Sequence, residues 1–93
     1  MLEDVFWELK NSGLVGSGNE FSREWLGMDA SYMRSLRAKN RQPSAKALAR
    51  CANRLKQTGD ALSNSTATNV LRKGLKCHAL ANLCVVELMR MSK

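Results

Sequence analysis

Apolar residues recur three or four positions apart along almost the whole chain, and this spacing most constrains its fold. Near the N-terminus, Leu2, Val5, Phe6 and Leu9 form one such stripe, which places them on one face of an α-helix. No run of alternating β-branched residues predicts a strand. The sequence therefore predicts an all-α protein.

Glycine, proline and capping residues divide this pattern into five predicted helices. The predicted helices span residues 2–12, 20–26, 30–39, 45–57 and 66–91. Gly27 and Gly59 stand where the second and fourth helices are expected to end, and Asp29 and Ser44 where the third and fourth begin. We expect a core domain over residues 1–59, a polar linker over 60–65 and a C-terminal helix within 66–93.

The basic residues are concentrated in one part of the chain. Fifteen Lys and Arg stand against eight Asp and Glu, a formal net charge of +7. Residues 30–58 contain no acidic residue and the following cations: Arg34, Arg37, Lys39, Arg41, Lys46, Arg50, Arg54 and Lys56. A solvated helix face usually mixes both signs, because like charges one turn apart repel. Double-stranded DNA, with its phosphate backbone, is the simplest partner for such a stretch.

Residues 20–39 combine a short helix, a turn entered by Gly27 and a second short helix, the order of a helix–turn–helix. Met28 is expected to fill the gap between the two helices. Met33 and Leu36, three positions apart, are expected to hold the second helix against the core. The opposite side of that helix, about Ala30–Lys39, is then free to enter a major groove.

This stretch resembles the Cro and lambda-repressor-like family of bacterial and phage regulators. The family pattern is matched without gaps over residues 26–44 by Leu26, Gly27, Met28, Tyr32, Met33, Leu36, Pro43 and Ser44. The Phe-Ser-x-x-Trp-Leu-Gly segment at residues 21–27 is also similar to small helix–turn–helix proteins of mobile elements and alphaproteobacterial chromosomes. The resemblance implies a five-helix, lambda-repressor-like DNA-binding domain, whose long C-terminal helix is not part of the minimal family domain.

One departure from the family concerns the first helix of the motif. The family usually carries a Leu-Ala pair five and four residues before the turn glycine, where this chain has Ser22 and Arg23. Either Phe21 and Ser22 take those two roles with one extra residue in the helix, or the two helices pack differently.

The resemblance also implies which residues meet DNA. The expected base contacts are Ala30, Ser31, Tyr32 and Arg34. Arg34 leads this set, because a guanidinium can bind guanine O6 and N7 together. The expected phosphate contacts are Ser22, Arg23, Arg37, Lys39, Arg41, Ser44 and Lys46. Such contacts fix the register of a protein on DNA without reading its sequence.

The second half of the last helix is apolar nearly all round, more than a small core can cover. Apolar and small residues recur there at seven-residue spacing, which suits contact with another helix. The expected dimer contacts are Val70, Cys77, Ala81, Cys84, Leu88 and Met91. A homodimer would place two recognition helices about one DNA turn, ~34 Å, apart. In the alternative, this helix only covers the core of its own chain.

The sequence carries no pattern typical of an enzyme, a metal site or a cofactor site. His78 has no second ligand pair near it, and the three cysteines are too few for a disulfide framework. No segment is long and apolar enough for a membrane span, so we expect a cytoplasmic, nucleoid-associated protein.

The leading interpretation is a sequence-specific DNA-binding transcriptional regulator, a homodimer on an inverted repeat. The alternative is a protein-interaction module, an antiactivator or adaptor that uses the same fold to bind another transcription regulator. Non-specific nucleic-acid binding would follow from the charge alone.

Overall fold

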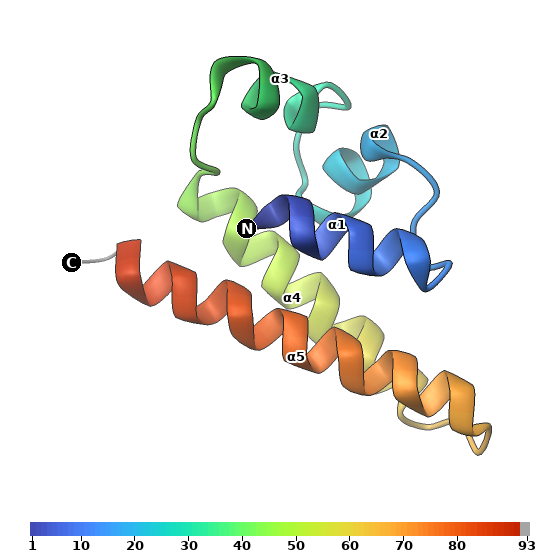
Figure 1. The fold of residues 1–93 in the computed structure, drawn as a ribbon. Helices are drawn as coiled ribbons and strands as arrows, with labels where there is room; N and C mark the ends of the chain where they lie inside the picture. Colours follow the sequence, from blue (N-terminus) through green and yellow to red (C-terminus); the bar gives the residue numbers. More distant parts are fainter. Residues whose placement is uncertain (92–93) are drawn as a thin grey trace.

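The computed structural model describes residues 1–91, and over these residues the chain is all-α, as predicted (Figure 1). Helix α2 continues directly into a wider helical turn, η1, so residues 1–91 form five helical segments. Their bounds are α1 Leu2–Asn11, α2 Gly18–Glu20 with η1 Phe21–Trp25, α3 Tyr32–Lys39, α4 Ala45–Leu62 and α5 Thr68–Met91. None of the helices described is long and apolar enough to cross a membrane.

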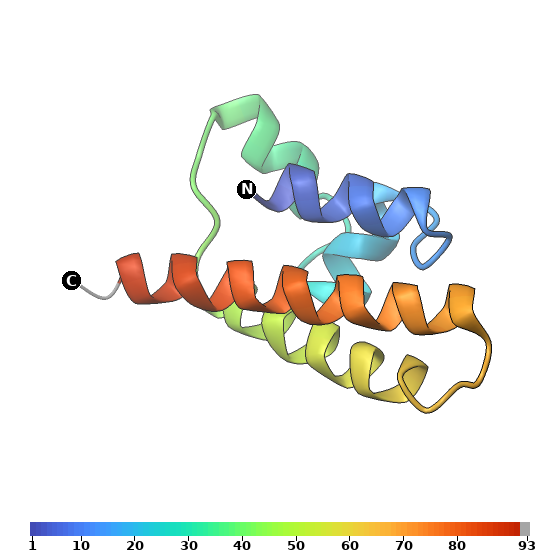
Figure 2. The same cartoon turned by 60° about the horizontal axis from the view of Figure 1, so that its bottom comes forward.

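Helices α4 and α5 run antiparallel along each other, and α1, α2 and α3 lie on one side of this pair (Figures 1 and 2). Leu48 and Leu55 of α4 are fully buried, as are Cys77 and Cys84 of α5. Burial of each leucine side chain contributes about 1.5–3 kcal/mol. The long C-terminal helix is therefore part of the core.

The predicted apolar stripe of α1 is confirmed. Leu2, Val5, Phe6 and Leu9 are all buried, and the Phe6 ring lies 5.5 Å from the ring of Phe21, centre to centre. The stripe thus joins α1 to the segment formed by α2 and η1.

Gly59 lies inside α4, whereas the sequence predicts that the helix ends there. Helix α4 continues to Leu62, and α5 begins at Thr68, so the connection spans residues 63–67 and not 60–65. A Cβ atom at Gly59 would come within 2.6 Å of His78 Nε2 and 3.0 Å of the Gly74 carbonyl oxygen. The residue is therefore glycine because α4 and α5 cross closely at this point.

The three cysteines are free thiols buried in the same core. The hydrogen bond with Cys84 and burial together raise the pKa of the Cys51 thiol. Burial raises the pKa of Cys77 as well. Cys51 and Cys77 are therefore held in the unreactive thiol form.

Candidate nucleic-acid interface

Ser22 connects the two short helices of the expected motif. Its hydroxyl donates to the Gly18 carbonyl oxygen at 2.9 Å and accepts from the backbone N–H of Met33 at 3.2 Å. The side chain is fully buried. The expectation that Ser22 contacts phosphate is therefore wrong, because its hydroxyl is used between α2 and α3.

The helix that carries Ser22 contains one extra residue. At its end, the N–H of Leu26 bonds the carbonyl of Phe21, five residues earlier, at 3.1 Å. This wider π-type turn lets both Phe21 and Ser22 point into the core, where both are fully buried. Of the two arrangements considered for this segment, the structure has the one with the extra residue.

The turn between the two helices is built around Gly27. Gly27 has φ +65°, a left-handed conformation that favours glycine, and it follows Leu26, the cap residue of η1. The Met28 N–H then donates to the Ser22 carbonyl oxygen at 2.9 Å. Asp29 accepts hydrogen bonds from the hydroxyl and the N–H of Ser31, and these bonds lower the pKa of Asp29.

Helix α3 has a packed side and an open side. Met33 is buried, and Met28 and Leu36 pack against the core, as predicted. The helix begins at Tyr32, two residues later than expected, because residues 30–31 belong to the turn that Asp29 stabilises.

The four expected base contacts differ in how free they are. The side chain of Arg34 is exposed, and within residues 1–91 it forms no ion pair. Ala30 is half-buried, and the Ser31 hydroxyl is held by Asp29. The Tyr32 hydroxyl accepts the Ser44 N–H at 3.0 Å, which ties α3 to the start of α4. Arg34 is therefore the most available of the four.

Two of the expected phosphate contacts have partners inside the chain. Arg37 forms an ion pair with Glu3 of α1, with its second hydrogen bond at 3.1 Å. The hydrogen bond with Glu3 raises the pKa of Arg37. The Ser44 hydroxyl accepts the Ala47 N–H at 3.1 Å, which confirms Ser44 as the cap of α4.

The remaining cations of that set are exposed. They are Arg23, Lys39, Arg41 and Lys46. In the part of the chain that the structure describes, none of them forms an ion pair with a carboxylate. These cations are therefore open to a partner.

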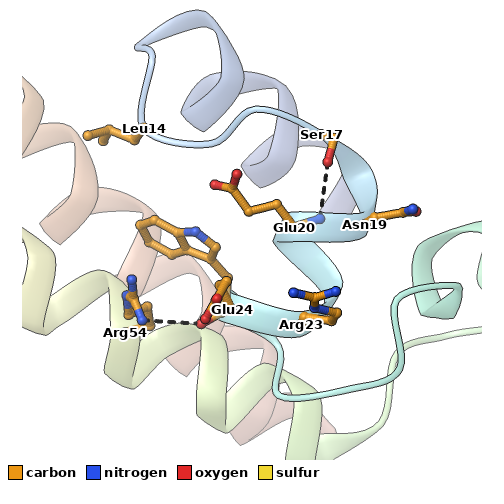
Figure 3. A pocket seen from close by; sticks show the side chains of 8 residues that line it. Leu14, Ser17, Asn19, Glu20, Arg23, Glu24 and Arg54 are labelled. Carbon is orange, nitrogen blue, oxygen red and sulfur yellow. Dashed lines mark hydrogen bonds between the residues drawn. The ribbon is translucent and has the colours of Figure 1, made fainter.

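Sequence reasoning did not assign Arg50 and Arg54 to the site, although both belong to the acid-free stretch. With Arg23, they line a polar hollow of about 310 Å³ between η1 and α4. The Arg54 guanidinium lies 5.1 Å from the centre of the Trp25 ring. It also donates to the Glu24 carbonyl oxygen, which Figure 3 shows in a view of the neighbouring pocket beside Leu14 and Glu20. The sequence does place Arg50 and Arg54 four residues apart on one predicted helix, and this spacing could have indicated that they share a site.

Three of the expected dimer contacts are used inside the chain. Cys77, Ala81 and Cys84 are buried in the core, so this fold does not offer them to a second copy. Val70 and Leu88 are half-buried, and Met91 is exposed. The exposed large apolar side chains of α5 are instead those of Leu75, Leu83, Val85, Val86, Met89 and Met91.

Over residues 1–91 no three His, Cys, Asp or Glu side chains come together as a metal site would require.

The chain belongs to the family described as "Family of unknown function (DUF6626)", which matches residues 2–93. No curated protein and no solved structure matches the chain.

Proposed function

We propose that the protein is a sequence-specific DNA-binding transcriptional regulator with a helix–turn–helix formed by α2, η1 and α3. The observation that carries the proposal is the open side of α3 and the loop after it. Arg34, Lys39 and Arg41 are exposed there and form no ion pair among the described residues, and the charge of Arg34 acts on Asp29 only at longer range. Cations that repel one another gain most from a polyanion such as duplex DNA.

The packing beneath α3 supports a recognition role for this helix. Met33 and Leu36 hold its apolar side, the Ser22 hydroxyl holds its first turn, and the Tyr32 hydroxyl holds the start of α4. A rigidly held helix loses little conformational entropy on binding, so its exposed side chains can discriminate between base pairs.

The proposed roles divide between base reading and phosphate binding. Arg34 reads a guanine, and Lys39, Arg41 and Lys46 bind phosphates. Arg37 has a structural role instead. Its guanidinium lies over the Phe6 ring and pairs with Glu3, and these contacts join α3 to α1.

We further propose that the regulator is a homodimer, with the outer face of α5 as the contact between copies. Among residues 1–91, six of the eight exposed large apolar side chains lie on α5. Leu75, Leu83 and Val86 lie on one side of the helix, away from the buried cysteines, and are 65%, 54% and 54% exposed. A two-fold axis would cover this row with the same row of a second copy, which suits an inverted-repeat operator.

The test for DNA binding is a titration of the protein with selected and random duplexes at two salt concentrations. Specific binding gives a large ratio of affinities and a steep decrease with salt. Arg34→Ala should reduce the affinity for the selected duplex by about 1–3 kcal/mol and that for random DNA much less. Arg72→Ala, an exposed arginine at the far end of α5, is the matched control.

An equal loss on both duplexes would make Arg34 a phosphate contact and refute its role in base reading. No binding to any duplex at low salt would refute the proposed function and favour the protein-interaction module.

Sedimentation equilibrium tests the dimer. The native chain should sediment as a dimer at micromolar concentration, and Leu83→Lys as a folded monomer. Ala38→Lys, which adds the same charge at an exposed position of α3, should remain a dimer. A native monomer at that concentration would refute the homodimer.

A further inference from the structure

We infer that the hollow between η1 and α4 is a phosphate-binding site formed by Arg23, Arg50 and Arg54. It is separate from the open side of α3. Where its phosphate comes from the DNA backbone, the inference rests on the proposed function. Where the phosphate is a free anion, it does not.

The charge of the hollow favours an anion. Three arginines line it, together with the side-chain amides of Asn53 and Gln57, and Glu24 is the one acidic residue in its lining. Across residues 1–91, none of the three guanidinium groups forms an ion pair with a carboxylate. Arg50 and Arg54 lie one turn apart on α4 and repel each other, and a bound anion would relieve this repulsion.

The Arg50 guanidinium lies close to Gly27. A Cβ atom at residue 27 would come within 2.7 Å of Arg50 Nη2 and 2.9 Å of its Cζ. The guanidinium therefore lies directly over the turn, in the space that only glycine leaves open. The same residue that forms the turn after η1 thus makes room for a cation beside it.

The Arg54 guanidinium is positioned by a ring and a carbonyl group. It lies over Trp25, itself buried, and donates to the Glu24 carbonyl oxygen at 3.4 Å (Figure 3). Arg54 is thus held near the hollow before a ligand arrives, and the Arg50 guanidinium lies over the turn beside it. Such pre-organisation lowers the entropy lost on binding, and the planar guanidinium suits the oxygens of phosphate.

The ligand class is a phosphate group, and the available sources are a DNA phosphodiester and a free phosphate. In the first arm of the test, the Arg Nε–H signals of the protein are followed by NMR while inorganic phosphate replaces chloride at constant ionic strength. The Arg50 and Arg54 signals should shift and saturate. Arg50→Ala should abolish the saturable shift of Arg54, and Lys56→Ala, an exposed cation of α4 outside the hollow, should leave it unchanged.

In the second arm, the affinity of the same variants for selected and random duplexes is measured against salt. If the phosphate belongs to DNA, Arg50→Ala reduces the affinity for both duplexes by the same factor and lowers the log–log salt slope by about 1. Lys56→Ala should change the slope less. Arg54→Ala provides a second variant, and circular dichroism checks that each variant is folded.

The two arms separate the sources. If Arg50→Ala, but not Lys56→Ala, loses both the saturable NMR shift and affinity for DNA, the bound phosphate belongs to the DNA backbone. If Arg50→Ala loses the NMR shift alone, the ligand is a free phosphate. If no duplex binds but phosphate still saturates, the proposed function fails and the phosphate site stands. If Arg50→Ala matches Lys56→Ala in both arms, the phosphate site is refuted.

Discussion

Replacing Ser22 with alanine should loosen α3 without unfolding the chain. The Met33 N–H is at the start of α3, where the helix itself supplies no acceptor, and it is buried against the Ser22 hydroxyl at 3.2 Å. Ser22→Ala removes this acceptor and adds no bulk. A buried N–H without a partner lowers the free energy of unfolding by about 1–3 kcal/mol. The better helix propensity of alanine offsets less than ~0.7 kcal/mol of this loss. The expected net loss is about 1–2 kcal/mol.

Urea unfolding followed by circular dichroism measures this loss, and the melting temperature should fall by about 4–8 °C for each kcal/mol. Ser35→Ala is the matched control, because Ser35 is exposed on α3 and its hydroxyl forms no hydrogen bond within residues 1–91. It should leave stability within about 0.5 kcal/mol. If both variants unfold at the same urea concentration, the Ser22 hydroxyl does not hold the two helices together and the reasoning is refuted.

Three further variants or reagents test the core and its edge. Gly59→Val should cost about 1–3 kcal/mol by urea unfolding because its side chain meets His78, and exposed Ala61→Val should cost less than about 1 kcal/mol. The three cysteines should react with a thiol reagent only as fast as the chain unfolds, and rapid native labelling would contradict their burial. Glu3→Gln should lower stability by less than about 1 kcal/mol, since its pair with Arg37 is half-exposed, and 1 M salt should remove the difference.

The sequence predicted those parts of the fold that depend on neighbours along the chain. The stripe from Leu2 to Leu9, the left-handed Gly27 and the Ser44 cap all follow from spacing and local backbone chemistry. The buried side of α3 follows from the same kind of argument. Each of these features involves residues within about one or two helical turns.

Features that depend on distant partners could not be predicted in this way. Gly59 has the sequence signature of a helix end, but its role comes from the His78 ring, nineteen positions later. The pair between Glu3 and Arg37 joins residues 34 positions apart. The sequence predicts Ser22 as a surface hydroxyl, whereas in the fold it is buried against the Met33 N–H. In each case the chemistry was visible in the sequence and the partner was not.

Helix α5 shows the same limit at the level of a whole helix. A seven-residue repeat of small and apolar residues indicates that one face is covered, but it does not identify the covering helix. In this chain the repeat that includes Cys77 and Cys84 packs in the core with α4, while Leu75, Leu83 and Val86 are left open on another side. The excess of apolar residues that first suggested a dimer therefore remains after the core is filled. It now lies on a surface that a second copy can reach, and substitutions there can change the oligomeric state without creating a cavity in the core.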